Sequence, residues 1–439
     1  MLYRKIKSKI EDFLIKSPNK VLLVEGARQI GKTYIIRNIG NEMFPNFIEI
    51  NMAEDKMKNR DFENVKSVED FYLKLSSFAG KKMKSREDTL IFIDEIQEYP
   101  ELITLLKFLN DDGKYRYIAS GSLLGITLAE ITSIPIGTIE ILKMYPLDLE
   151  EFMLANGFGD TYINYLKEHF IKRESLDEKE HNKVLEVFKK YLLVGGMPDA
   201  VNSFINDKNI IKIRAIHENI INLYKIDCSK YDKEKKLRIQ RLYELIPSNM
   251  ENKKKRIILK DIENKKGKTK DDYQEDFEYL ISSGIAIGVN AISEPRFPLI
   301  QSTMKTLIKL YMNDVGLLTY ILYRDNIKPI LDDIKSINLG SVYETFAAME
   351  LKAHVGNIYY YDNKKNGEVD YLVDDYENLS VVPIEVKSGR NYYVHSAISN
   401  LIDISNYNIK EGILFTNDKQ VKDKEKIIQM PIYYISFIK

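Results

Sequence analysis

The chain has 439 residues, of which 44% are hydrophobic and 30% charged, enough apolar material for several packed domains. Its 65 lysines and arginines balance its 65 aspartates and glutamates, so no overall charge draws it to nucleic acid or to an anionic membrane. The single cysteine, Cys228, excludes an internal disulfide and a cysteine-based zinc site. Residues 1–16 alternate charged with apolar side chains, unlike a signal peptide, and we expect a cytoplasmic protein.

A nucleotide-binding motif follows the first predicted strand. Residues 1–16 are predicted to be helical, and residues 20–26, KVLLVEG, are predicted to form a buried strand. The next segment, GARQIGKT, matches the pattern G-x-x-x-x-G-K-T and leads into a helical stretch, which is the context that the pattern requires. Backbone N–H groups of such a loop and the start of its helix bind phosphate. We therefore predict an ATP site formed by Gly26, Ala27, Arg28, Gln29, Ile30, Gly31, Lys32 and Thr33.

Two side chains of this loop are assigned chemical roles. Lys32 is predicted to reach the β- and γ-phosphates, and Thr33 is predicted to hold Mg²⁺ through its hydroxyl. The alternative is a chance match to the pattern, and the strand before the loop and the helix after it argue against that alternative.

Four more strands are predicted in this region, at residues 46–52, 89–95, 115–121 and 137–146. The second of them ends in Asp94 and Glu95, about 60 residues after the loop. We expect Asp94 to bind the water shell of Mg²⁺ and Glu95 to polarise the attacking water, which favours hydrolysis over transfer to another substrate. A solvated turn after a strand would look the same in sequence.

The strand predicted at residues 115–121 leads into a Ser-Gly-Ser segment. ATPases with an extra strand between the loop strand and the Asp-Glu strand usually place a polar sensor of the γ-phosphate at this position. Ser120 is the first candidate for that role and Ser122 the second. Gly121 between them makes a simple turn the alternative.

The middle of the chain is predicted to be helical, with a long helix at residues 204–224 and a winged-helix-like unit between residues 235 and 300 whose ribbon uses IAIGVN and PRFPLI. This unit carries a basic run: Lys253, Lys254, Lys255, Arg256, Lys260, Lys265, Lys266, Lys268 and Lys270. Its third helix carries acidic residues that would repel phosphate: Asp271, Asp272, Glu275, Asp276 and Glu278. Contact with DNA or RNA is one expectation, and packing against protein with a solvated lysine loop is the other.

Residues 340–439 alternate between helices and strands. A helix is predicted at residues 341–354 and another at 395–404, with strands at 358–363, 368–375, 381–388, 412–417 and 431–438. Because residues two apart share one face of a strand, Glu385 and Lys387 should point together. A hairpin turn should bring Asp370 beside Glu385.

These side chains indicate a second metal site. We predict that Asp370 and Glu385 coordinate Mg²⁺, that Lys387 orients or deprotonates an attacking water, and that Glu344 supplies an outer ligand or a water contact. The alternatives are that Ser341-x-x-Glu344 is a capping box, that Glu385 and Lys387 form an exposed ion pair, and that the domain is an inactive binding module.

His354 has no partner at metal-ligand spacing, and we interpret it as structural.

With these motifs in place, the chain resembles the archaeal and bacterial family of AAA-type ATPases in which the ATPase domain is fused to a restriction-endonuclease-like domain of the PD-(D/E)xK kind. The resemblance rests on GARQIGKT, IFIDEIQEYP (91–100), SGS (120–122), YPLDLEEF (145–152), YLLVGGMPDAV (191–201), KLYMNDVGLL (309–318), GSVYETFAAMEL (340–351) and GEVDYLV…PIEVKSG (367–389). It implies an α/β protein in four parts: a P-loop ATPase domain at residues 1–155, a helical lid at 156–230, a winged-helix-like domain at 231–325 and a restriction-endonuclease-like domain at 326–439.

The resemblance also implies a function, namely ATP hydrolysis whose nucleotide state is coupled to a nuclease-like domain acting on nucleic acid. The alternative is a regulatory ATPase whose C-terminal domain binds protein or DNA without cutting it. Relatives commonly carry Gly-Arg where this chain has Gly137-Thr138, and an arginine at the second position would be a natural finger for ATP. Either Arg28, or another arginine of the chain or of a neighbouring subunit in a homo-oligomer, then serves as the finger, or hydrolysis is slow.

Overall fold

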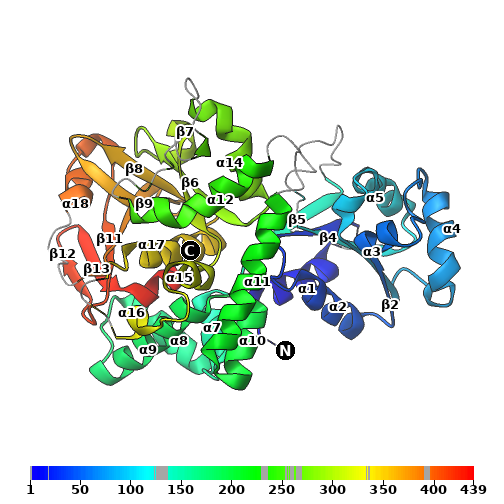
Figure 1. The fold of residues 1–439 in the computed structure, drawn as a ribbon, viewed down its shortest axis with the longest axis horizontal. Coiled ribbons are helices and arrows are strands. Elements are labelled where there is room, and N and C mark those ends of the chain that lie inside the picture. The colour runs from blue at the N-terminus through cyan, green and yellow to red at the C-terminus, as the bar shows by residue number, and fades with distance from the viewer. Residues whose placement is uncertain are drawn as a thin grey trace. The chain divides into compact units, whose positions relative to one another are not determined.

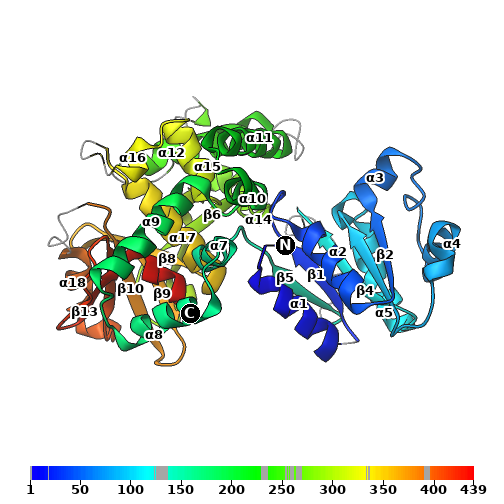
Figure 2. The same ribbon diagram turned by 90° about the horizontal axis from the view of Figure 1, so that it is seen from below.

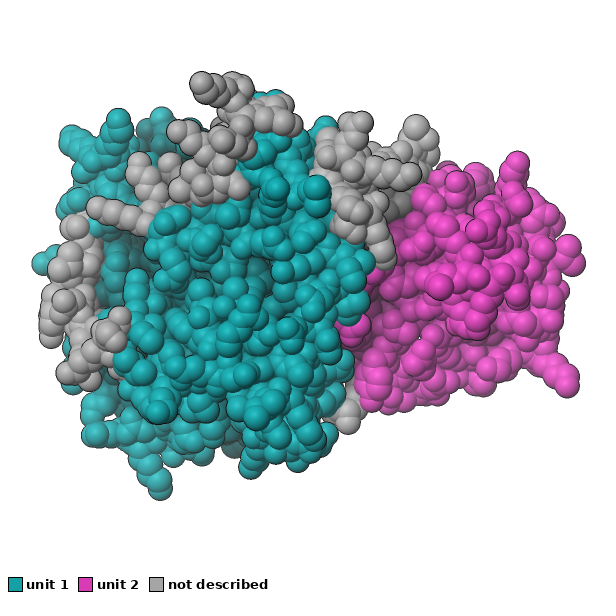
Figure 3. All heavy atoms as spheres, in the orientation of Figure 1, with its two compact units in different colours: residues 1–2, 146–281, 285–439 teal, residues 3–145, 282–284 magenta. Residues whose placement is uncertain are grey.

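The computed structural model describes residues 2–17, 19–122, 124, 137–228, 236–252, 255, 257, 262–263, 269–332, 334, 337–389 and 396–439, with the backbone alone at 236, 270, 271, 305, 306, 396 and 424. The chain divides into two compact units (Figure 3). The N-terminal unit comprises residues 3–145 with 282–284, and the C-terminal unit comprises residues 146–281 and 285–439 with 1–2. The four-part division predicted from the sequence is finer than this, and its further boundaries stay a prediction.

The N-terminal unit contains a five-stranded sheet in the order β2-β3-β4-β1-β5, and all of its strand pairs are parallel. Each of the five predicted strands is confirmed. They are β1 (Val21–Glu25), β2 (Asn46–Asn51), β3 (Thr89–Asp94), β4 (Arg116–Gly121) and β5 (Ile139–Lys143). Because β4 lies between β1 and β3, the carboxyl ends of these three strands meet at one edge of the sheet.

Helices of the N-terminal unit cover the strands (Figures 1 and 2). Side chains that alternate along β1, Val21 and Leu23, share an apolar core with Leu102 and Leu106 of α5. The adjacent helices α1 and α2 contact each other, and α2 packs on β2 and β3. The helices are α1 (Lys5–Lys16), α2 (Lys32–Met43), α3 (Met52–Met57), α4 (Val68–Ala79) and α5 (Glu101–Asp112).

The C-terminal unit contains an eight-stranded mixed sheet in the order β12-β13-β11-β10-β9-β8-β6-β7. Its strands are β6 (Ala286–Ile292), β7 (Thr303–Met312), β8 (Tyr359–Asn363), β9 (Gly367–Asp375), β10 (Ser380–Val386), β11 (Gly412–Thr416), β12 (Lys422–Lys424) and β13 (Ile427–Pro431). The ribbon of the predicted winged helix is formed by β6 and β7, not by PRFPLI, and β6 also pairs with β8. This ribbon therefore extends the C-terminal sheet. The strand predicted at residues 431–438 is wrong, because β13 precedes a 3₁₀ helix at Ile432–Phe437.

The helices of the C-terminal part are α7 (Leu149–Ala155), α8 (Asp160–Lys172), α9 (Glu178–Val194), α10 (Pro198–Asp207), α11 (Ile210–Cys228), α12 (Lys236–Glu251), α14 (Gln274–Ser282), α15 (Val315–Tyr323), α16 (Lys328–Leu331), α17 (Gly340–His354) and α18 (Ser396–Ile402). The single helix predicted at residues 204–224 is wrong. Lys208 ends α10 in the left-handed region with φ +51, and Asn209 Oδ1 accepts the N–H groups of residues 211 and 212 at the start of α11. Within the described residues, no helix has both the length and the apolar character needed to cross a membrane.

Most of the predicted basic run falls outside the described residues. Of its members, Lys255 is the one whose side chain is described, and it forms an ion pair with Glu344. On the acidic helix, Asp276 is fully buried and paired with Arg238, 2.9 Å from Arg238 Nη2 to Asp276 Oδ1. Lys255 is therefore not part of a solvated lysine loop, and the charge of Asp276 is neutralised by Arg238.

Three segments that carry the family resemblance pack on one another. Gly196 N donates to Asp314 Oδ2 at 2.6 Å, and Leu147 N donates to Gly196 O at 2.8 Å. Asp314 also accepts the N–H of Leu317, 3.0 Å away, as the capping residue of α15. Gly195 has φ +71, and a Cβ added there would lie 2.1 Å from Asp314 Oδ1. The positive φ and the close approach of the Asp314 carboxylate therefore both require glycine at position 195.

We predict that Gly195→Ala destabilises the protein more than Gly157→Ala. Both glycines have positive φ, but a Cβ at Gly157 meets nothing within 4 Å. Gly157→Ala should cost about 1–2 kcal/mol of backbone strain, and Gly195→Ala about 1–3 kcal/mol more because its methyl group displaces a buried carboxylate. Urea denaturation followed by circular dichroism compares the two variants, and equal losses would contradict the packing argument.

Candidate functional site

The first candidate site begins at the loop between β1 and α2. A Cβ added at Gly26 would lie 2.4 Å from Met144 O, so the loop approaches β5 too closely for a side chain. Gly31 adopts a left-handed conformation with φ +92 immediately before α2 begins at Lys32. The N-terminus of α2 therefore follows the loop directly, and the backbone N–H groups at a helix N-terminus attract anions.

Lys32 places a cation within this loop. Its Nζ donates to Gly26 O and to Ala27 O, each at 2.8 Å, and the side chain is buried. A buried ammonium next to a helix N-terminus is suited to binding phosphate.

Asp94, at the end of β3, accepts hydrogen bonds from three different elements. Its Oδ2 accepts Thr33 Oγ1 at 2.9 Å and Asn51 Nδ2 at 3.4 Å, and its Oδ1 accepts the hydroxyl of Ser120. Burial raises the pKa of the Asp94 carboxyl, while the hydroxyls of Ser120 and Thr33 act against that rise. Asn51 was not among the predicted site residues, although a polar residue at the end of a neighbouring parallel strand was a usable signal.

Glu95 leaves the strand in a left-handed conformation, with φ +53. Its carboxylate accepts a hydrogen bond from the side-chain amide of Gln97. Gln97 Oε1 is buried and has no hydrogen-bond partner among the described residues. Glu95 is therefore held by a neighbouring side chain, rather than solvated as in a simple turn. Gln97 was also missed from the sequence.

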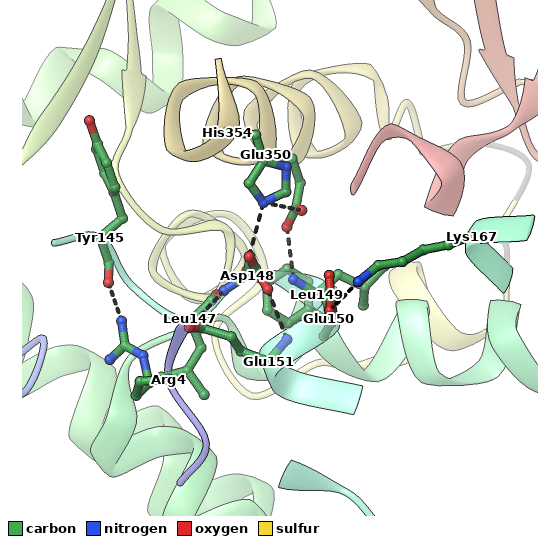
Figure 4. Close-up of polar contacts among 11 residues, drawn as sticks. Arg4, Tyr145, Leu147, Asp148, Leu149, Glu150, Glu151, Lys167, Glu350 and His354 are labelled. Carbon is green, nitrogen blue, oxygen red and sulfur yellow. Dashed lines mark hydrogen bonds and ion pairs between the residues drawn. The ribbon is translucent and has the colours of Figure 1, made fainter. Parts of the chain in front are cut away.

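One arginine belongs to the loop and another contacts it. Arg28 Nε donates to Ser122 Oγ at 3.3 Å, so the second candidate sensor contacts the loop and the first, Ser120, contacts Asp94. Arg4 donates from Nη1 to Ile30 O at 3.0 Å and from Nη2 to Tyr145 O at 2.6 Å (Figure 4). Arg4 thus connects the loop to the segment after β5, and no pattern in the sequence indicated this.

The second candidate site is in the C-terminal unit and contains the four predicted side chains. Glu344 comes from α17, Asp370 from β9 and Glu385 from β10, and Lys387 follows β10. The antiparallel pairing of β9 with β10 brings Asp370 beside this strand, where its Oδ2 accepts Val386 N at 3.0 Å. The sequence pattern and the hairpin geometry therefore agree on which residues come together.

The three carboxylates of this site are buried, with exposed fractions of 4% for Glu344, 8% for Asp370 and 4% for Glu385. Burial and the nearby Asp370 charge raise the pKa of Glu344 to about 7, and Lys255 opposes the rise. Burial and Asp370 also raise the pKa of Glu385, against the effect of Lys387. Such a cluster has a strong requirement for cations.

Two lysines supply part of the positive charge that the buried carboxylates require. Lys387 Nζ pairs with Glu385 Oε1, and Lys255 Nζ pairs with Glu344 Oε1. The other oxygens, Glu344 Oε2 and Glu385 Oε2, are buried and have no hydrogen-bond partner among the described residues. Carboxylate oxygens left in this way fit a hard divalent cation such as Mg²⁺.

Two alternative interpretations of these residues are wrong. Glu344 does not form a capping box with Ser341, because α17 begins at Gly340 after Leu339, and Glu344 binds Lys255 instead. The pair of Glu385 with Lys387 is not an exposed surface pair, because Glu385 is buried.

A second buried ion pair lies near the carboxylates. Lys309 on β7 is fully buried, pairs with Glu368 on β9, and has its Nζ 4.5 Å from the centre of the Tyr360 ring. Its charge also acts on Glu344. Neither Lys309 nor Glu368 was singled out from the sequence, because their pairing depends on the strand order of the sheet.

A separate cluster links α17 to the start of α7 (Figure 4). His354 Nε2 lies 2.9 Å from Asp148 Oδ2, and Leu149 N donates to Glu350 Oε1 at 2.9 Å. Asp148, Glu350 and His354 each offer one possible metal-ligand atom, and these atoms all lie within 4.8 Å of one another. Among the described residues, this is the one group of three or more His, Cys, Asp or Glu side chains that meets this distance. The prediction that His354 has no partner at this spacing is wrong, although Glu350, one helical turn earlier, was visible in the sequence. Asp148 also accepts Glu151 N at 2.8 Å, so these contacts cap α7.

Two archaeal proteins are similar to the whole or to half of this chain. An uncharacterized protein of Methanocaldococcus jannaschii is 24% identical over 431 residues, which make up 94% of this chain and 87% of that protein. A second uncharacterized protein of the same archaeon is 24% identical over 250 residues, or 54% of this chain and 51% of that protein.

Two solved structures are similar to this chain, both with TM-scores below 0.5. The Walker-type ATPase of Pyrococcus abyssi has a TM-score of 0.42 and 16% identity, covering 73% of this chain and 96% of that chain. The Saccharomyces cerevisiae Hsp104–ADP complex has a TM-score of 0.31 and 14% identity, covering 64% of this chain and 38% of that chain.

Three protein families match successive parts of the chain. Residues 185–328 match one domain of unknown function (DUF8612), and residues 339–435 match another (DUF4143). Residues 18–153 match an AAA domain, and this range contains the loop of residues 26–33, Asp94 and all five strands of the parallel sheet. The N-terminal unit is therefore an AAA-type P-loop ATPase domain.

Proposed function

We propose that this chain binds ATP with Mg²⁺ at the loop of residues 26–33 and hydrolyses it. The observation that carries the proposal is the hydrogen bond from Thr33 to Asp94 beside the buried Lys32. Lys32 binds the β- and γ-phosphates, while Thr33 and Asp94 hold the metal and its water shell. When bound, Mg²⁺ neutralises charge on the phosphate oxygens.

Glu95 is the proposed base for the attacking water, and Gln97 holds its carboxylate until the nucleotide is in place. Ser120 is the proposed sensor of the γ-phosphate, with Ser122 as the second candidate. Arg28 is the arginine of the loop itself and contacts Ser122. It, or an arginine from a neighbouring copy in a homo-oligomer, supplies the cation that Thr138 cannot.

We further propose that nucleotide state is coupled to a nuclease-like site in the C-terminal unit, with DNA or RNA as its substrate. Support comes from Asp370 and Glu385 lying on paired strands, from Glu344 and Lys387 acting on them electrostatically, and from two buried carboxylate oxygens without a hydrogen-bond partner among the described residues. Asp370 and Glu385 would hold Mg²⁺, which supplies charge stabilisation at a phosphodiester. Lys387 is proposed to orient a water molecule. Burial lowers the pKa of Lys387, but Glu385 and Asp370 raise it above its usual value, so the lysine stays charged and does not accept the proton of that water.

A regulatory ATPase whose C-terminal domain binds without cutting is the second candidate. The observation that favours it is that Glu344 and Glu385 each already pair with a lysine. Such pairs reduce the attraction of the site for a divalent cation. Cleavage assays with labelled DNA and RNA in Mn²⁺ distinguish the two candidates.

Lys32→Ala should lower ATP affinity by about tenfold to hundredfold, because it removes one or two charge-assisted hydrogen bonds to phosphate. Isothermal titration calorimetry with ATP and Mg²⁺ measures the change. Lys16→Ala is the matched control, since Lys16 is exposed and pairs with the exposed Asp12 on the same helix. If wild type and Lys32→Ala bind ATP with equal affinity, the proposal that Lys32 in this loop binds the phosphates of ATP is contradicted.

Glu95→Gln should retain ATP affinity but lower turnover by about 10²–10⁴-fold, because the amide cannot accept a proton from water. Phosphate release under saturating ATP gives the rate. Glu98→Gln is the control on the same segment, where Glu98 pairs with Lys56 at 3.2 Å. If Glu95→Gln turns over at the wild-type rate, another residue is the base.

Asp370→Asn should abolish a thermal stabilisation by Mn²⁺ that the nucleotide-free wild type shows, because it removes one of the two proposed metal ligands. Asp375→Asn, at the end of the same strand, where Asp375 binds Asn378, should keep that stabilisation. Melting curves of the full chain across Mn²⁺ concentrations test this. A wild type with no metal-dependent shift would show that the C-terminal site is degenerate.

A further inference from the structure

Lys255 is placed by contacts between α12 and α17. It lies just beyond Glu251, the last residue of α12, and its N–H donates to Asn252 O at 3.0 Å. Glu251 accepts the hydroxyl of Ser341 in the first turn of α17, and Lys255 reaches Glu344 one turn further along. The end of α12 is thereby fixed to α17 at two points, and the second point is a proposed metal-site residue.

The ammonium of Lys255 faces several carboxylates. Its side chain is 20% exposed, while that of Glu344 is 5% exposed. Burial lowers the pKa of Lys255, but Glu344, Asp370 and Glu368 raise it above its usual value, so the lysine stays charged. Lys309 on β7 and Lys387 after β10 are further cations that act on Glu344. Lys255 is thus a permanent positive charge beside the proposed metal ligands.

The charge of the carboxylates can be balanced either with Lys255 in place or with a divalent cation, but not with both together. When ionised, Glu344, Asp370 and Glu385 carry three negative charges, Lys255 and Lys387 supply two positive charges, and the ion pair of Lys309 with Glu368 adds no net charge. A divalent cation added to this set leaves an excess positive charge in a buried place, which is costly. If Lys255 leaves, the same cation brings the three carboxylates and Lys387 to neutrality.

We infer that Lys255 is an internal counter-ion that competes with the divalent cation for Glu344, and that metal binding releases the lysine side chain. The inference rests on the proposed metal site of Asp370 and Glu385. It adds a regulatory element, because whatever moves the end of α12 changes the affinity of the site for metal. Lys255 would keep the site inactive at low metal concentration.

The test is calorimetric titration of Mn²⁺ into the nucleotide-free full chain, counting only the binding that Asp370→Asn abolishes. Lys255→Gln should bind Mn²⁺ about tenfold more tightly than wild type, since it removes a competing charge. Lys255→Arg keeps the charge and should retain the wild-type affinity. Lys167→Gln is the matched control, because Lys167 also pairs with a buried glutamate that is not part of the proposed metal site. Its Nζ lies 2.6 Å from Oε1 of Glu150 (Figure 4).

A second readout uses the wild-type protein, so it does not depend on the variants folding. Acylation of Lys255 by an N-hydroxysuccinimide ester, followed by mass spectrometry, should rise several-fold when Mn²⁺ is added. Acylation of Lys167 should stay constant. Mn²⁺ bound equally by wild type and Lys255→Gln, with constant acylation of Lys255, overturns the inference and leaves the metal site intact. No Mn²⁺ bound by either protein overturns the metal site and the inference together.

Discussion

The nucleotide site depends on one buried carboxylate, that of Asp94. A buried negative charge is stable only where donors or cations surround it. Thr33, Ser120 and Asn51 supply those donors from α2, β4 and β2. Only a parallel sheet in the observed order brings these ends together, because β4 lies between the loop strand and β3. The fold of the N-terminal unit and its chemistry are therefore set by the same requirement.

The C-terminal unit meets a similar requirement in a different way. Glu344, Asp370 and Glu385 are gathered by a helix and a hairpin, but two of them are neutralised by lysines rather than by hydroxyl and amide donors. Neutral donors leave the charge of Asp94 available to Mg²⁺, whereas an ammonium reduces the charge available to a metal. Under the two proposals, this difference separates a first site that binds nucleotide constitutively from a second site whose metal binding is regulated.

Local patterns predicted the five strands, the loop and the hairpin that joins Asp370 to Glu385, because each depends on residues near one another in sequence. The helix break at Lys208 was missed, since a non-glycine residue in the left-handed region leaves little trace in a periodic pattern. The contacts of Arg4 and Lys255 were missed because their partners are far along the chain, 89 residues away for Lys255. Only the tertiary fold shows that Lys255 faces Glu344 and not solvent.

The most direct test of the account is a structure with Mg²⁺ and a non-hydrolysable ATP analogue. The account predicts that Lys32 Nζ moves from Gly26 O and Ala27 O to the β- and γ-phosphates. It also predicts that the Thr33 hydroxyl binds Mg²⁺, with Asp94 on a coordinated water. A bound nucleotide that leaves Lys32 on the loop carbonyls and Thr33 on Asp94 would contradict it.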